Sequence, residues 1–270
     1  MVKPTHNDRG PPDYEAWVRE ALEQPGKIHQ AYSLFWEFSL GNQMLAMMQL
    51  PKPEPIANFN KWKELGRHVK RGEKAIGLLM PVTRKKETED GQEENRTFFM
   101  LKHYWFGLSQ TEGAEYTPPP IPGFSITRAA ENLGITIESF QSINGNVQGY
   151  AKTDEKIIAV SPLAYNKRKT FFHEAAHVLL HPRSLELPKM LREGEAELAS
   201  YLVSCALGHT ENLEFSRGYI RNWLGNDGSP KLRYPEVFKT VDAILRAGRD
   251  PEPAPERPAY SPQPAREMHP

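Results

Sequence analysis

The spacing of apolar residues predicts that helices make up much of this 270-residue chain. Apolar positions recur every three to four residues, as on one buried helix face, in two N-terminal stretches, 14–24 and 28–50. The same spacing predicts helices at 126–133, 170–181, 193–207, 215–224 and 234–247. Pro25-Gly26 ends the first helix, and Gly41-Asn42 predicts a break or kink inside the second.

Short apolar runs bounded by turn residues predict two groups of strands. The first group is 75–82 and the strongly aromatic run 97–108, on either side of an acidic loop at 87–94. The second group is 135–140, 148–152 and 156–160, separated by turns at Asn144-Gly145-Asn146 and Thr153-Asp154. This second group predicts a three-stranded antiparallel meander that runs directly into the helix at 170–181.

Composition predicts where the folded domains begin and end. Residues 1–13 are polar and residues 250–270 contain seven prolines, so both ends are predicted to be disordered. Pro118-Pro119-Pro120 predicts a stiff linker at 117–123, between a domain at 14–116 and another at 124–249. With no apolar run of about 18 residues and no signal-peptide core, the sequence predicts a soluble, cytoplasmic protein without a membrane partner. The single cysteine, Cys205, excludes a disulfide framework.

The clearest chemical motif is His173-Glu174-Ala175-Ala176-His177. A helix turns about 100° per residue, so His173 and His177 share one face and can bind one Zn²⁺ together. Glu174 lies beside that face, where its carboxylate can act as the general base that takes a proton from water. The alternative, two solvated histidines on a surface helix, is disfavoured because the flanking residues are apolar nearly all round.

Zinc needs a third protein ligand, and Glu193 and Glu197 are the candidates on the following helix. Thermolysin-like zinc peptidases take this ligand from the first residue of a Glu-x-x-x-Asp pattern, and that resemblance assigns Glu193 to the metal. Glu197 would then orient His173, or it is itself the ligand. His181 is expected to end the helix, too far from His173 to share one ion. Three residues could stabilise an oxyanion: Tyr201, His209 and Tyr219.

A basic, aromatic region in the N-terminal half predicts a surface for single-stranded nucleic acid. The whole chain has no net charge, but residues 61–86 hold nine Lys or Arg against two Glu, so 9 − 2 gives a local charge of +7. Phosphates would lie on the cations and bases on the rings. A solvated basic face over an aromatic core is the alternative, and the polar residues of the preceding helix could equally satisfy backbone groups. The predicted contacts are Lys61, Trp62, Lys63, Arg67, Lys70, Arg71, Lys74, Trp105, Asn42 and Gln49.

Five motifs together resemble the ArdC-like antirestriction family of plasmids, phages and bacterial genomes. They are residues 38–45 with Gln49, 62–75, 105–113, the histidine helix with Glu193–Glu197, and 219–224. The resemblance implies an N-terminal domain that binds single-stranded DNA and a C-terminal zinc-metallopeptidase-like domain. One position departs from the pattern: Gly107 stands where family members often have asparagine, so a nucleic-acid contact could be lost there.

The expected fold class is α+β, with N-terminal helices and a small antiparallel sheet, then a zincin-like domain of a small antiparallel sheet, an active-site helix and further helices. The expected function is single-stranded-DNA binding combined with zinc-dependent cleavage of a protein substrate that the sequence does not identify. Two alternatives stay open. One is a regulatory protease of the ImmA/IrrE type that cuts a repressor. The other is a DNA-coating protein whose zinc is structural.

Overall fold

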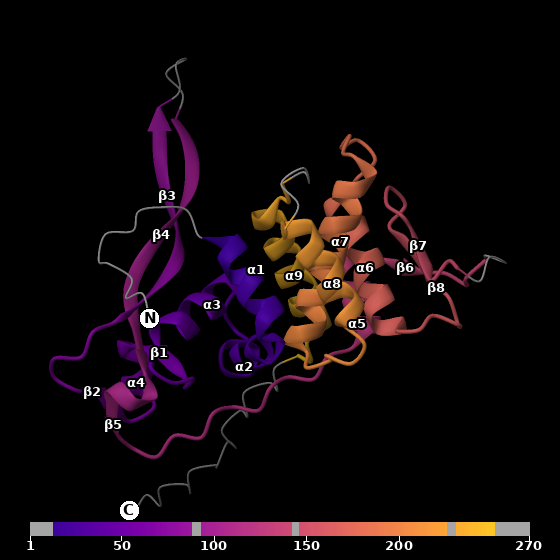
Figure 1. Ribbon diagram of the computed structural model, residues 1–270. Helices are drawn as coiled ribbons and strands as arrows, with labels where there is room; N and C mark the ends of the chain where they lie inside the picture. The colour runs from indigo at the N-terminus through magenta and orange to yellow at the C-terminus, as the bar shows by residue number, and fades with distance from the viewer. Residues whose placement is uncertain (1–12, 88–92, 142–145, 226–230, 252–270) are drawn as a thin grey trace, which may run out of the picture.

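The computed structural model describes residues 13–87, 93–141, 146–225 and 231–251. It is a mixed α+β structure, as predicted, with a group of helices between sheets on opposite sides (Figure 1). The predicted disordered ends lie almost wholly outside the described residues. Among the described helices, none has the length and apolarity that crossing a bilayer requires.

Three helices open the described chain: α1 (Tyr14–Glu23), α2 (Pro25–Phe35) and α3 (Leu40–Gln49). The break in the second predicted helix lies before Leu40, not at Gly41-Asn42, so that position was wrong by a few residues. The reason is a helix cap: the Ser39 hydroxyl accepts a hydrogen bond from the Asn42 amide, at 3.4 Å, and starts a new helix.

The N-terminal sheet is antiparallel with strand order β1-β4-β3. Its strands are β1 (Ile56–Asn58), β3 (Ile76–Glu87) and β4 (Glu93–Gly107), and the last two are longer than predicted. They form a hairpin that projects away from the helices (Figure 1). Between them, 88–92 of the predicted acidic loop lie outside the described residues. Helix α4 (Phe59–Glu64), the short pair β2 (Arg67–Val69) and β5 (Thr111–Gly113), and the 3-10 turn η1 (Leu108–Gln110) complete this part.

Helix α3 takes the place of a neighbouring strand along the outer edge of β3. The Asn42 amide group exchanges two hydrogen bonds with the backbone of Leu79, at 2.8 and 3.0 Å. Gln49 does the same with Gly77, at 2.8 and 2.9 Å. At a strand edge every second residue has an N–H and a C=O without a partner strand. The two side-chain amides satisfy these groups at Leu79 and Gly77. Both side chains thus satisfy backbone groups of the sheet, the alternative considered above, and their contact with DNA stays a prediction.

The C-terminal sheet has the order β6-β8-β7, which corrects the predicted meander. Strands β7 (Gly149–Lys152) and β8 (Ile157–Val160) form the expected antiparallel hairpin, but β6 (Thr136–Ile137) pairs with β8 in parallel. Ile158 and Ala159 of β8 are both fully buried. A strand that buries both faces belongs in the middle of a sheet, which leaves β7 at an edge. The predicted turn at 144–146 falls mostly outside the described residues.

Five helices complete the fold: α5 (Ile126–Leu133), α6 (Lys167–Leu180), α7 (Lys189–Ala206), α8 (Glu214–Gly225) and α9 (Tyr234–Gly248). Helix α7 is buried without interruption from Gly194 to Ala206, so it forms the centre of the main core. Apolar residues of α1, α2 and α3 belong to the same core as those of α5–α9. The domain division at 117–123 stays a prediction, but the packing of the N-terminal helices crosses it.

Candidate metal centre and nucleic-acid surface

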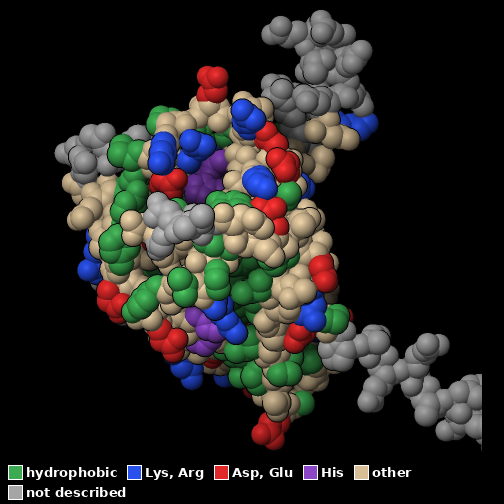
Figure 2. All heavy atoms as spheres, turned by 90° about the vertical axis from the view of Figure 1, so that its right-hand side faces the viewer, with side chains coloured by type: hydrophobic (Ala, Val, Ile, Leu, Met, Phe, Trp, Pro, Cys, Tyr) green, Lys and Arg blue, Asp and Glu red, His purple; other side chains and the backbone are tan. Residues whose placement is uncertain are grey.

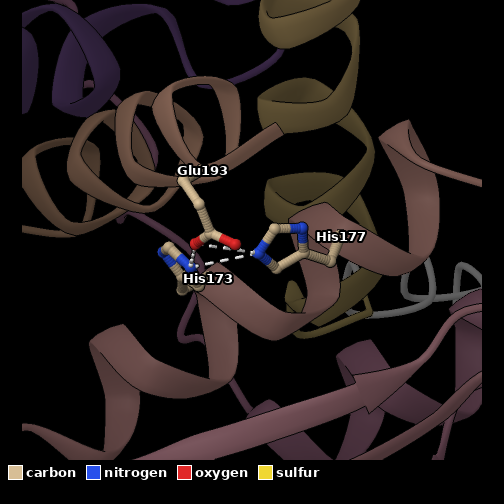
Figure 3. Close-up of side chains that lie close together, drawn as sticks. All are labelled: His173, His177 and Glu193. Atoms are coloured by element: carbon tan, nitrogen blue, oxygen red, sulfur yellow. Dashed lines mark hydrogen bonds and ion pairs between the residues drawn. The ribbon is translucent and has the colours of Figure 1, made fainter. Parts of the chain in front are cut away.

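Helices α6 and α7 bring His173, His177 and Glu193 together (Figure 3). Both histidines project from one face of α6, one turn apart, and Glu193 reaches them from the first turns of α7. The other sides of α6 are anchored in the core, where Phe172 and Ala175 are fully buried. The apolar residues that surround the histidines in the sequence thus fix the helix that carries them.

The distances between the three side chains fit a single small cation. The two Nε2 atoms lie 3.2 Å apart, and Glu193 Oε2 lies 3.4 Å from that of His173 and 3.6 Å from that of His177. Four-coordinate zinc with bonds of about 2.0–2.1 Å separates its ligand atoms by about 3.3 Å. The three atoms therefore form one face of a tetrahedron of about the right size, and the residues present fit a metal ion.

The positions of the ring protons support the same conclusion. His173 Nδ1 lies 3.2 Å from Glu197 Oε2, and a carboxylate can only accept, so this nitrogen carries the proton. His173 Nε2 is then left with a lone pair directed at Glu193. Burial would lower the pKa of His173, but hydrogen bonds to Glu193 and Glu197 outweigh it and raise the pKa to about 9. Acceptors that converge in this way require a cation between them, either a proton or a metal.

Glu197 has an environment different from that of Glu193. The Lys169 ammonium lies 2.9 Å from its Oε1 and 3.0 Å from its Oε2, and His173 occupies Oε2 as well. Burial would raise the pKa of Glu197, but His173 and Lys169 together lower it to about 2. Glu197 is thus a neutralised partner of His173, while Glu193 faces only the two Nε2 atoms. The geometry favours Glu193 as the ligand.

A hollow of ≈ 220 Å³ opens over this cluster and is lined by Glu174, His177, His181, Glu193, Arg192 and residues 151 and 153. Figure 2 shows histidine side chains in a recess on this face of the molecule, with acidic and basic side chains around it. Burial raises the pKa of the Glu174 carboxyl, and the nearby histidines oppose the rise. Gly149 of β7 lets the sheet approach α6 here, since a Cβ would lie 2.7 Å from Thr170 Cγ2 and 3.2 Å from Glu174 Cγ.

The three residues considered for oxyanion stabilisation lie in different places. Tyr201 is fully buried and donates to the carbonyl of Ala21, at 3.0 Å. His209 Nε2 lies 2.6 Å from an Arg168 guanidinium nitrogen. Tyr219 is half-buried, and its pKa is raised by burial and then by the charges of Glu193 and Glu197. Of the three, Tyr219 is the one whose electrostatic neighbours belong to the metal cluster.

Sequence reasoning missed several groups behind the cluster. Lys169 stands one helix turn before His173, so the two side chains share one helix face. Because Glu197 was expected to contact His173, this spacing could have predicted a contact between Lys169 and Glu197 as well. His181 is the C-cap of α6, as predicted, but it is also buried and bonded to Glu195. Arg233, which binds Glu195, comes from a segment 38 residues away along the chain. No local signal in the sequence connects Arg233 to this site.

Trp62 corrects the predicted nucleic-acid surface. Its side chain is 1% exposed and its indole N–H donates to the carbonyl of Phe106, at 2.8 Å. A ring with no exposed face cannot stack on a base, so the prediction that Trp62 contacts DNA is wrong. Trp105 is half-buried and packs edge-on against Phe38.

Two of the predicted cations also hold the fold together. The Arg67 guanidinium donates to the hydroxyl and carbonyl of Thr111 and to the carbonyl of Ala114. Lys70 donates through Nζ to the carbonyl of Ser109, at 2.8 Å. These bonds join the motif at 62–75 to the motif at 105–113. The remaining predicted cations are exposed: Lys61, Lys63, Arg71 and Lys74.

Two aromatic rings that were not among the predicted contacts are exposed in this region. Phe59 and Tyr104 are each 54% exposed. Both line a hollow of ≈ 470 Å³ whose other walls include Asn58, Asn60 and Trp105. Rings beside amide groups at the surface are the elements that unstacked bases require.

The departure at Gly107 has a structural reason. A Cβ at this position would lie 2.3 Å from Glu54 Oε1 and 3.1 Å from Leu50 Cδ2. Glu54 is buried and accepts hydrogen bonds from the backbone and hydroxyl of Ser109, at 3.0 and 2.6 Å. In this chain Glu54 occupies the space that a larger residue at 107 would need.

Comparison with known proteins adds a family for the N-terminal part. Residues 13–106 match the family described as the N-terminal domain of anti-restriction factor ArdC. The uncharacterized protein pXO2-81 of Bacillus anthracis is 25% identical over 250 residues, an alignment that covers 71% of this chain and 41% of that protein. The chain thus spans about two fifths of the length of this curated relative.

Two crystal structures of the antirestriction ArdC protein from R388 plasmid are similar to this chain. The metal-free structure has 17% sequence identity and a TM-score of 0.49, and the match covers 87% of this chain and 94% of that one. The Mn(II)-bound structure has 16% identity and a TM-score of 0.45, with 87% and 95% covered. On the match of its residues 13–106, the chain is ArdC-like, and that part of it belongs to the family of the ArdC N-terminal domain.

Proposed function

We propose that this chain is a zinc-dependent peptidase whose N-terminal part binds single-stranded DNA, with a role in antirestriction or DNA transfer. The observation that carries the peptidase is the triangle of His173 Nε2, His177 Nε2 and Glu193 Oε2, which has tetrahedral dimensions and lies under an open hollow. Structural zinc sites have four protein ligands, whereas three ligand atoms meet here among the described residues. This count favours a catalytic site over the structural-zinc alternative.

The protein's own groups would each have a defined task. Zinc, when bound, supplies the Lewis acidity that polarises a peptide carbonyl and eases the deprotonation of water. Glu174, with its raised pKa, accepts that proton and returns it to the leaving amine. Within the described sheet, β7 pairs only with β8, so its other edge can pair with an extended peptide beside the hollow. Among the three residues considered, Tyr219 is the candidate for stabilising the developing negative charge, because its electrostatic neighbours are Glu193 and Glu197.

The single-stranded-DNA proposal has three supports. The ArdC N-terminal domain match covers this region, four predicted cations are exposed, and two exposed rings line a hollow in the same part of the chain. The antirestriction role is proposed because the matched family and the similar structures carry that description. A regulatory protease of the ImmA/IrrE type remains the second candidate, because the same metal cluster would serve it and the N-terminal part would dock a protein instead.

The first prediction concerns the metal ligands. Glu193→Ala should abolish zinc retention, because it removes one of three ligands. Glu197→Ala should weaken zinc affinity by about 10–100-fold, the usual effect of removing a group that orients a ligand histidine. Competition with a chelator measures both, and the exposed Glu186→Ala is the matched control. The opposite ranking would make Glu197 the ligand.

The second prediction concerns catalysis. Glu174→Gln keeps the size of the side chain but cannot accept a proton, so cleavage should fall by about 10²–10⁴-fold with zinc content unchanged. The assay follows peptide release from fluorescein-labelled, unfolded casein, with Glu186→Gln as the control. Wild-type turnover in the Glu174→Gln variant would remove Glu174 from the mechanism.

The third prediction concerns DNA. Four engaged cations, each contributing about −0.7 to the slope of log K against log[salt], give a slope near −2.8 on single strands. Reversing Lys63 and Arg71 to Glu should halve that slope and lower affinity, whereas reversing Lys167 and Lys239, exposed on α6 and α9, should not. Tyr104→Ala and Phe59→Ala should lower affinity with little change in slope, because stacking releases no counterions.

Fluorescence anisotropy with a labelled oligonucleotide at several salt concentrations measures these effects. Phe215→Ala is the aromatic control, since Phe215 is 81% exposed on α8, away from the basic region. Equal competition by duplex and single-stranded DNA would contradict single-strand binding.

A further inference from the structure

A second line of polar groups ends at His177 and lies outside the three-ligand cluster. His181 is 2% exposed, and its Nδ1 lies 3.0 Å from Nδ1 of His177. Its other nitrogen, Nε2, lies 3.0 Å from Oε2 of Glu195, which is fully buried. His181 therefore connects a ligand histidine to a carboxylate inside the core.

Arg233 completes the line from the segment that enters α9. Its guanidinium donates to Glu195 Oε2 at 2.6 Å and to Oε1 at 2.9 Å, and its backbone N–H donates to Oε1 at 2.9 Å. Another guanidinium hydrogen bond reaches the Leu180 carbonyl, at 3.3 Å, near the end of α6. A buried carboxylate held by a guanidinium in this way stays ionised and acts only as an acceptor.

The hydrogen bonds then fix every proton in the line. Because Glu195 only accepts, His181 Nε2 must carry a proton, and in the neutral ring His181 Nδ1 offers a lone pair. The proton between the two histidines must therefore belong to Nδ1 of His177. His177 Nε2 is left unprotonated, and this is the nitrogen that faces Glu193 and His173.

We propose that His181, Glu195 and Arg233 are positioning residues that hold His177 in the tautomer and ring orientation needed to bind the metal. The inference rests on the proposed metal site. Glu197, which is paired with Lys169, orients His173 by a direct contact, whereas Glu195 acts on His177 through the intervening neutral imidazole of His181. Glu197 is paired with Lys169 and Glu195 with Arg233, so neither of these outer carboxylates adds uncompensated negative charge to the site.

The experiment compares three variants of the full chain. His181→Leu removes both hydrogen bonds, His181→Asn keeps an acceptor near Nδ1, and Glu195→Gln keeps an acceptor for His181 but removes the charge. We expect His181→Leu to weaken zinc affinity by about 10–100-fold in chelator competition, and His181→Asn to recover part of the loss. Ser204→Ala is the control, because it removes a buried hydrogen bond to Ser200 in the same helix α7 but lies outside this line.

The second readout is the ring protonation of His177, followed by ¹⁵N NMR of imidazole-labelled protein with and without zinc. Wild type should show the Nδ1–H tautomer in both states, and His181→Leu should lose this preference while Ser204→Ala keeps it. If His181→Leu destroys the fold, His181→Asn and Glu195→Gln carry the comparison. Zinc affinity within twofold of wild type and an unchanged tautomer in the folded variants would overturn the proposal.

The two proposals fail in different ways. One outcome is that wild type binds no zinc but shows the Nδ1–H tautomer of His177, and that His181→Leu loses this tautomer. This result would contradict the proposed zinc peptidase and support the positioning role of His181, Glu195 and Arg233. If wild type binds zinc and none of the variants weakens that binding, only the proposed positioning role is contradicted.

Discussion

The packing of α6 against α7 is the constraint on which the rest of the structure depends. It places Glu174, Glu195 and Glu197 in the interior, each at most 8% exposed. Buried charges are costly unless they are paired. Lys169 compensates Glu197 and Arg233 compensates Glu195, and both cations come from elements that the packing brings close. The carboxylates of Glu193 and Glu174 have no such partner among the ion pairs described, and a cation from solution can bind to Glu193 and the two imidazole lone pairs.

The same two helices connect the site to the rest of the molecule. Helix α7 is buried on every side, and its far side meets the N-terminal helices, where Tyr201 bonds to α1 and the Ala206 carbonyl to His29 of α2. Helix α3 then clamps the edge of β3 through Asn42 and Gln49. The metal cluster lies on the main core and the N-terminal sheet on a second, smaller core, and helices α2 and α3 contribute buried residues to both.

Local chemistry explains what the sequence could predict. Helix α5 begins after Ser125, which caps Arg128, and ends at Gly134 in a left-handed conformation, so its bounds of 126–133 followed from the residues alone. The i, i+4 spacing of His173 and His177 likewise fixed their common face. Three-dimensional partners decided the rest. The sequence places Trp62 on the surface, but in the structure its indole bonds to the Phe106 carbonyl and the Tyr116 ring packs against it. The sequence also predicts a meander, but β8, buried on both faces, takes the centre of the sheet and pairs with β6 in parallel.

The metal site rests on three ligand atoms in a triangle of 3.2, 3.4 and 3.6 Å. X-ray absorption at the zinc edge of the purified chain, loaded with one equivalent of zinc, tests it most directly. The account predicts only nitrogen and oxygen neighbours at about 2.0–2.1 Å, with the outer-shell scattering of two imidazoles and no sulfur. A spectrum with fewer than two imidazoles, or zinc that washes out on dialysis, would contradict it.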